Sequence, residues 1–238
     1  MTIEDMHYDV LQKLSKIDSN KYKRLVVPEI DWMLNESQDI IIKNISQPRR
    51  VNALGFEINQ RTIDDIRTIV VNADDTTAII PTTYDDESYQ ASLPEDYKFF
   101  VSAYASVVKN GCAKKIRCYP VQHDDLHEED YMSVSSFEWE EVNMRFFEDG
   151  IRLFTDGTFT IQKVYLNYIR IPLYMHNAKD FENGSYKLPN GTELTDHQDC
   201  ELPDHIHSEI VDMAVLVATN NLRIGDYNIK KDKINLTN

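Results

Sequence analysis

Glycine is scarce in this sequence, with only 7 among 238 residues. Loops that cradle phosphate groups need closely spaced glycines, because the backbone must come close to the phosphate. The sequence contains no G-x-G-x-x-G, Walker A or G-x-S-x-G pattern. We therefore expect neither a nucleotide-binding loop nor the nucleophile turn of an α/β-hydrolase.

Cysteine is rarer still, and Cys112, Cys118 and Cys200 cannot all pair within one chain. With no CxxC, this count is typical of free thiols in a reducing compartment. Basic residues between Cys112 and Cys118 favour a lowered thiol pKa. A catalytic cysteine also needs a positioned base, so we interpret these cysteines as small packing residues.

Positive charge is in short supply, since 25 basic residues stand against 40 acidic ones and the formal net charge is -15. Such a balance repels phosphate backbones and disfavours reading of nucleic acid through a basic face. Passive contact with DNA remains compatible with this charge, because a negative channel wall lets a polyanion slide past without binding.

Long hydrophobic runs are absent as well. The longest candidate, Met213 to Ala218, is far shorter than the roughly 18 apolar residues of a membrane span. The first ten residues are acidic and polar, unlike a signal peptide. We expect a soluble protein that is made in a cytoplasm and does not enter a membrane.

Apolar residues at three- and four-residue steps predict helices at both ends of the chain. The patterns run from Ile3 to Ile17, from Ile30 to Ile45 and from Ile206 to Ala218. Thr2 with Asp5 offers a capping signal before the first helix. With 42% hydrophobic residues, the chain has enough apolar material for a sizeable core.

The middle of the chain is typical of β-structure. Phe99 to Val108 and Lys114 to Val121 predict strands, as does Thr76 to Pro81. Asp156-Gly157 lies between two apolar runs and predicts a tight hairpin. The second run, which ends at Ile171, changes the parity of its apolar positions, as a β-bulge or a change of partner sheet would require.

The order of these elements predicts an α+β fold, with an antiparallel β-rich domain inserted into a helical bundle of the N- and C-terminal helices. We expect four parts, joined by long loops. These are a helical part over 1–66, the β-rich insertion over 67–175, an extended loop over 176–201, and over 202–238 a helix and tail that pack on the first helices.

Three short segments carry a resemblance to a known family. The first is Ile30-Asp-Trp-Met-Leu-Asn-Glu-Ser, on a helix. The second pairs Leu93-Pro-Glu-Asp-Tyr at a strand entry with Tyr168-Ile-Arg-Ile-Pro at a strand exit. The third is Glu201-Leu-Pro-Asp-His-Ile-His-Ser, which opens the last helix. This ordered set resembles the head-to-tail adaptor and neck ring proteins of short-tailed bacteriophages, and is particularly similar to those of crAss-like phages.

The resemblance implies a structural protein of the virion without catalytic residues or cofactor. It implies a homo-oligomeric ring, twelve-fold in many relatives, which assembles in the host cytoplasm. The ring would sit below the portal protein, contact neck and tail proteins, and form part of the DNA channel. Closing such a ring requires two different complementary patches on each subunit.

Two alternative functions come from other residues. His123 and His127, four apart in an acidic segment, have the spacing of zinc ligands on a helix and suggest a metal-dependent hydrolase. No third ligand is specified, so a solvated contact loop explains the segment more simply. His197, Cys200, His205 and His207 form a second candidate set without ligand spacing.

A glycan-binding accessory module is the other alternative. Aromatic side chains form platforms for sugars, although most aromatic residues in a chain of this kind are expected in the core or at subunit interfaces. The candidates are Trp139, Phe146, Phe147, Tyr165, Tyr168 and Tyr174.

Overall fold

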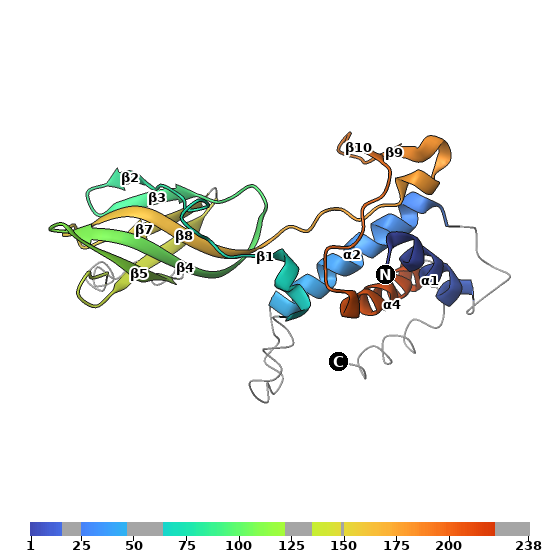
Figure 1. Ribbon diagram of the computed structural model, residues 1–238, viewed down its shortest axis with the longest axis horizontal. Helices are drawn as coiled ribbons and strands as arrows, with labels where there is room; N and C mark the ends of the chain where they lie inside the picture. The colour runs from blue at the N-terminus through green and yellow to red at the C-terminus, as the bar shows by residue number, and fades with distance from the viewer. Residues whose placement is uncertain (16–24, 47–63, 122–134, 149, 222–238) are drawn as a thin grey trace, which may run out of the picture. The chain divides into compact units, whose positions relative to one another are not determined.

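The computed structural model describes residues 1–15, 25–46, 64–121, 135–148 and 150–221, and it divides into two compact units (Figure 1). The helical unit comprises the described residues of Met1–Ile69 and Pro172–Asn238, and the β unit is Val70–Ile171. The β unit is thus inserted into the chain of the helical unit. The α+β class expected from the sequence is confirmed.

Three helices form the core of the helical unit: α1 (Ile3–Ser15), α2 (Val27–Ser46) and α4 (His207–Asn221). α4 packs against both α1 and α2 (Figure 1). No helix among the described residues is both long enough and apolar enough to cross a membrane. The stripe that predicted α1 is buried, namely Ile3, Met6, Val10 and Leu14.

The start of α1 is fixed by the expected cap. The Asp5 backbone N–H donates to Thr2 Oγ1 at 3.2 Å, and the Thr2 N–H donates to Asp5 Oδ2 at 3.0 Å. The two residues thus satisfy each other's backbone donors at the start of the helix. These hydrogen bonds to the carboxylate, chiefly from the Thr2 backbone, lower the pKa of Asp5.

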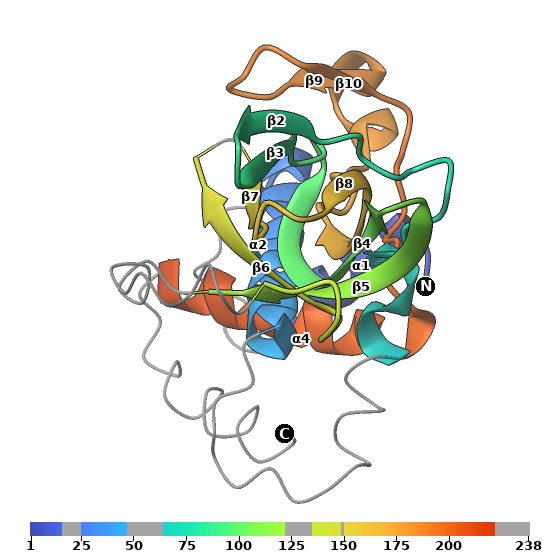
Figure 2. The same ribbon diagram turned by 90° about the vertical axis from the view of Figure 1, so that its left-hand side faces the viewer.

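The β unit contains one eight-stranded sheet in the order β1-β8-β4-β5-β6-β7-β3-β2. Seen end on, the sheet curls round a core to which both of its halves contribute (Figure 2). All its pairs are antiparallel except β5 with β6, which departs from the antiparallel sheet expected from the sequence. The strands are β1 (Val70–Val71), β2 (Thr82–Asp85), β3 (Ser88–Ser92), β4 (Tyr97–Lys109), β5 (Cys112–Pro120), β6 (Glu141–Phe147), β7 (Gly150–Phe154) and β8 (Thr160–Arg170).

A tight hairpin of this sheet lies between β4 and β5. Asn110 and Gly111 form its two-residue loop, with φ of 51° and 79°. Positive φ at both positions defines a type I′ turn, whose twist matches that of the flanking strands. The strands predicted over 99–108 and 114–121 are confirmed as β4 and β5.

The hairpin predicted at Asp156-Gly157 is wrong. Gly157 does have a positive φ of 74°, but three strands lie between β7 and β8 in the sheet. The turn residues fix the local backbone and not the partner of the strand that follows. Because the sheet curls, the chain leaving β7 crosses over the core, and β8 bonds to β4 and β1.

The strand predicted over 76–81 is also wrong. Only Ile79 bridges to the sheet, opposite Val164. The Asp74 carboxylate accepts the backbone N–H groups of Thr76 and Thr77, each at 2.9 Å. Such side-chain bonds favour a turn over a strand.

The bulge expected in the second apolar run lies at Gln162. Ser106 pairs with Lys163 while Val107 pairs with Ile161, so Gln162 is the extra residue. Ile161 and Val164 are therefore both buried although they are three positions apart, where a regular strand would place them on opposite faces. The change of parity that predicted a bulge is confirmed.

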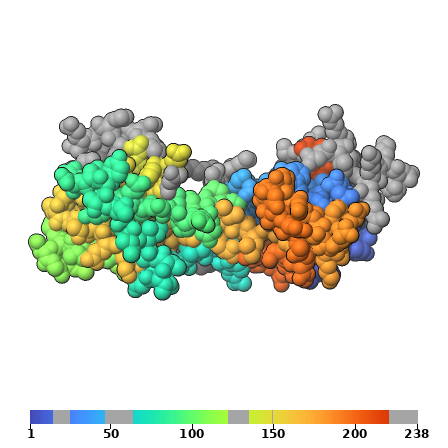
Figure 3. Space-filling model, turned by 90° about the horizontal axis from the view of Figure 1, so that it is seen from above, coloured from blue at the N-terminus to red at the C-terminus, as the bar shows by residue number. Residues whose placement is uncertain are grey.

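The polar segment 176–201, expected as an extended loop, has structure of its own. A two-stranded sheet pairs β9 (Ser185–Lys187) with β10 (Glu193–Thr195). In the space-filling view this orange segment lies against the blue surface of α2 (Figure 3). The short 3-10 helices η4 (Ala178–Asp180) and η5 (Glu182–Gly184) precede the sheet, and η6 (Asp204–Ile206) leads into α4.

Two glycines give a test of this β unit. A Cβ added at Gly150 would lie 2.3 Å from the backbone oxygen of Ala91, whereas at Gly111 it would meet nothing within 4 Å. We expect Gly150→Ala to cost about 3 kcal/mol through the clash. Gly111→Ala should cost about 1 kcal/mol, from backbone strain alone. Urea unfolding of both variants measures the difference, and equal costs would contradict the register of β3 with β7.

Candidate functional site

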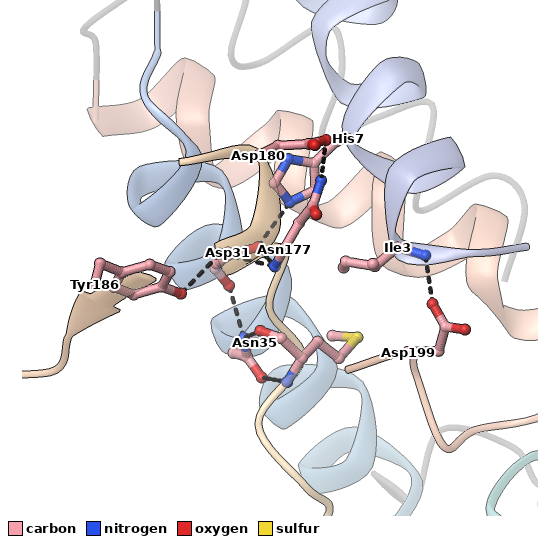
Figure 4. A network of polar contacts seen from close by, with 9 residues as sticks. Ile3, His7, Asp31, Asn35, Asn177, Asp180, Tyr186 and Asp199 are labelled. Atoms are coloured by element: carbon pink, nitrogen blue, oxygen red, sulfur yellow. Dashed lines mark hydrogen bonds and ion pairs between the residues drawn. The ribbon is translucent and has the colours of Figure 1, made fainter. Parts of the chain in front are cut away.

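The most buried charged side chain among the described residues is Asp31, which lies on α2 and is 0% exposed. Its carboxylate is surrounded by hydrogen-bond donors from three parts of the helical unit (Figure 4). His7 Nε2 on α1 lies 2.7 Å from Oδ1, and the Tyr186 hydroxyl on β9 donates to Oδ2 at 2.7 Å. The Asn177 backbone N–H lies 3.2 Å from each oxygen. We call these four residues the Asp31 network.

The chemistry of the Asp31 network follows from burial. A carboxylate taken out of water must be compensated by donors, or its burial costs several kcal/mol. Because an ionised carboxylate only accepts hydrogen bonds, Nε2 of His7 carries the proton. Burial, together with the hydrogen bond to Asp31, raises the pKa of Tyr186 far above its usual range, so the phenol remains a donor.

A second contact holds the chain just before Asn177. The Asn35 side chain donates from Nδ2 to the Met175 carbonyl at 2.7 Å and accepts the Met175 N–H at 2.9 Å (Figure 4). Its amide thus bonds the backbone of Met175 as a neighbouring strand would. The Leu173 N–H donates to Glu201 Oε2 at 2.7 Å. The segment 173–177 is therefore fixed at alternate residues.

These contacts bring together segments that the sequence analysis considered separately. Asp31 and Asn35 belong to the first segment of the family resemblance, and Glu201 opens the third. All three bind the chain that follows Tyr168-Ile-Arg-Ile-Pro, the strand-exit part of the second. The polar residues of these motifs therefore act as ties between chain segments.

Sequence reasoning missed the Asp31 network, although one signal for it exists. Asp31 directly follows Ile30 and precedes Leu34 by three residues, so it lies beside the apolar stripe of α2 on the buried face. A carboxylate on such a face requires buried donors. Which residues supply them is not readable from the helix, since Tyr186 lies 155 positions away.

The candidate metal ligands within the described ranges lie apart from one another. His123 and His127 lie outside the described residues, so the metal-dependent hydrolase stays a prediction. His205 Nε2 contacts Asp65 at 2.8 Å, while His207 Nε2 contacts the Leu202 carbonyl at 2.8 Å. His197 Nδ1 contacts Asp196 instead. Within the described ranges, no three His, Cys, Asp or Glu side chains are placed to hold a metal ion.

The cysteines are free in the structure, and two of them are shielded. Burial raises the pKa of Cys118 to about 12 and that of Cys200 to about 11. The lowering expected from neighbouring basic residues is therefore wrong for Cys118, because Ile116 and Cys118 face the core while Arg117 faces outward. Both thiols stay protonated near neutral pH and are poor nucleophiles.

The candidate sugar platform is dispersed. Tyr165 and Tyr168 are buried, and their hydroxyls donate to Asp75 at 2.6 Å and Asp96 at 2.8 Å. Phe146 packs against the core of the β unit. Only Trp139 is highly exposed, at 79%.

Comparison with models of known protein families gives no match, and comparison with curated proteins gives none either. The geometry defines a structural class of site: a sealed polar network that fixes the course of the chain in the helical unit.

The Asp31 network predicts a large cost for removing its acceptor. Asp31→Ala leaves three buried donors without a partner, so we expect the helical unit to lose about 3–5 kcal/mol of stability. Asp39→Ala on the same helix is the control, because the surface pair of Asp39 with Lys43 should cost only about 0.5 kcal/mol. Chemical denaturation of both variants measures these two losses of stability. Similar losses would show that the network does not stabilise the fold.

The burial of His176, which precedes Asn177 of the Asp31 network, predicts that the stability of the fold depends on pH. Burial lowers the pKa of His176, while the Asp31 carboxylate opposes this shift. Below its ordinary pKa of about 6.5 the unfolded chain therefore binds a proton that the folded chain excludes, and stability falls with falling pH. We expect His176→Gln to flatten the stability profile between about pH 7.5 and 5.5. Identical slopes for the variant and the wild type would refute this role.

Proposed function

We propose that this protein is a structural subunit of the head-to-tail connector of a short-tailed phage. It forms an adaptor or neck ring below the portal, contributes to the DNA channel, and docks tail proteins. It works through its surfaces and catalyses no reaction. The protein is assembled in the host cytoplasm and ends in the virion.

The observation that carries this proposal is that polar residues of the first and third motif segments bind the chain that directly follows the second. Asn35 binds Met175, Asp31 binds Asn177 and Glu201 binds Leu173. Polar residues of the motifs that carry the family resemblance thus bind backbone groups of the segment 173–177. Contacts that fix the course of the chain in this way suit a protein that must keep its shape under mechanical force.

The helices supply the proposed ring contacts. We assign α1, α2 and α4 to a helical bundle formed from the N- and C-terminal helices, as in the proposed family. Large apolar side chains point outward from it, with Tyr8 64% and Trp32 49% exposed. Exposed apolar side chains on neighbouring helices are typical of subunit interfaces.

Charge supports the channel role. A chain with a net charge of -15 repels phosphate backbones, so DNA would pass a ring of such subunits without binding to it. We propose a homo-oligomeric ring, twelve-fold as in many of the relatives it resembles, with heterologous contacts between subunits. The portal and the tail proteins are its other partners.

Trp32 offers a test of assembly. Trp32→Glu places a charge within the proposed apolar contact, so we expect it to prevent ring formation on a portal protein while leaving the monomer folded. Trp139→Glu is the matched control, since Trp139 belongs to the β unit and is more exposed. Negative-stain imaging of portal mixtures shows whether rings form. If Trp32→Glu assembles as the wild type does, the assignment of the helices to the ring interface fails.

A further inference from the structure

Two arginines lie side by side on the outer face of the β unit. Arg145 on β6 pairs in register with Arg152 on β7. Their neighbours Met144 and Leu153 point the other way, into the core. Like charges opposite each other on two strands are destabilising. The register therefore places two guanidinium groups next to each other on this face.

The arginines line a hollow of about 250 Å³ together with Phe147 and Phe154. Aromatic rings hold the Arg152 guanidinium in place. Its Cζ lies 3.7 Å from the ring centroid of Tyr84 and 5.6 Å from that of Phe147. A guanidinium stacked on rings in this way is oriented in advance and loses little freedom when it binds a ligand.

Arg152 retains unused donor capacity. Among the described residues, its buried Nε has no hydrogen-bond partner. Asp85 is near enough for Arg152 to contribute to lowering its pKa, but the Ser88 hydroxyl is the main cause of that shift. Asp85 also accepts the Glu87 N–H within its own hairpin. Arg145 has an interaction of its own, so the argument rests on Arg152.

The shape of the Arg152 guanidinium indicates which chemical group it would bind. Its planar edge presents paired N–H groups that match the two oxygens of a carboxylate. Two phenyl rings line the hollow, so a carboxylate that enters it contacts apolar surface, which strengthens its hydrogen bonds to the guanidinium. The space suits a single side chain.

We propose that the hollow binds an Asp or Glu side chain from a second copy of this chain. Each copy carries 40 acidic residues and a net charge of -15, so carboxylates are its most abundant charged groups. The contact is heterologous, since a basic hollow on one copy meets an acidic patch on the next. This inference deepens the proposed ring function and rests on it.

The test measures self-association of the full chain by sedimentation velocity over a range of protein concentrations. Arg152→Glu should weaken the association constant at least about 30-fold, because it removes a desolvated charge pair and adds repulsion. Arg152→Lys keeps the charge but loses the paired N–H groups, so it should weaken association about tenfold. The matched control is Arg117→Glu on β5, where the guanidinium also lies over a ring, 5.2 Å from the Tyr119 centroid.

Arg117→Glu should associate as the wild type does. The proposal is overturned if the wild type stays monomeric at every concentration, or if Arg117→Glu and Arg152→Glu weaken association equally. It is also overturned if Arg152→Glu loses binding to a short duplex DNA while self-association is unchanged. Circular dichroism of each variant verifies that the sheet is intact.

Failure of this inference and failure of the ring function give different results. If Arg152→Glu still forms rings with a portal protein, only the carboxylate contact is wrong. If the wild type associates through Arg152 but is found in no phage particle, the contact stands and the connector function is wrong.

Discussion

One buried carboxylate sets the course of the chain in the helical unit. Asp31 can be buried only because α1, β9 and the backbone at Asn177 all supply donors to it. If one of these parts moved away, the Asp31 carboxylate would lose a hydrogen-bond donor while it stayed buried in the core. The network therefore couples the first helix to a segment that follows the β unit in sequence. This coupling makes the helical unit one structure although its chain is interrupted by the insertion.

How much of this could be predicted depends on the range of the interactions. Helical periodicity and the Thr2–Asp5 cap are local signals, and the structure agrees with them. The Asn110-Gly111 turn is an equally local signal and does join two paired strands, whereas Asp156-Gly157 predicts a hairpin that does not form. That interpretation failed because the turn residues fix φ, whereas the curl of the sheet selects the partner strand. The partners of Asp31 lie up to 155 residues away, and no local pattern contains them.

The Asp31 network and the hollow at Arg152 differ in whether they leave hydrogen-bonding capacity unused. In the Asp31 network each carboxylate oxygen already has donors, so the site has no capacity for a ligand and acts on the fold alone. At Arg152 a buried N–H lacks an acceptor among the described residues, and its orientation is fixed by Tyr84. The first arrangement stabilises a subunit and the second is suited to joining subunits. A protein that works by assembly requires both.

The central claim is that this chain forms the ring between a phage head and its tail. Single-particle cryo-electron microscopy of phage particles that contain the protein tests this most directly. The account predicts density for both units, repeated around the DNA channel immediately below the portal. Finding the chain only outside the particles, as a monomer with no ring in the connector, would contradict it.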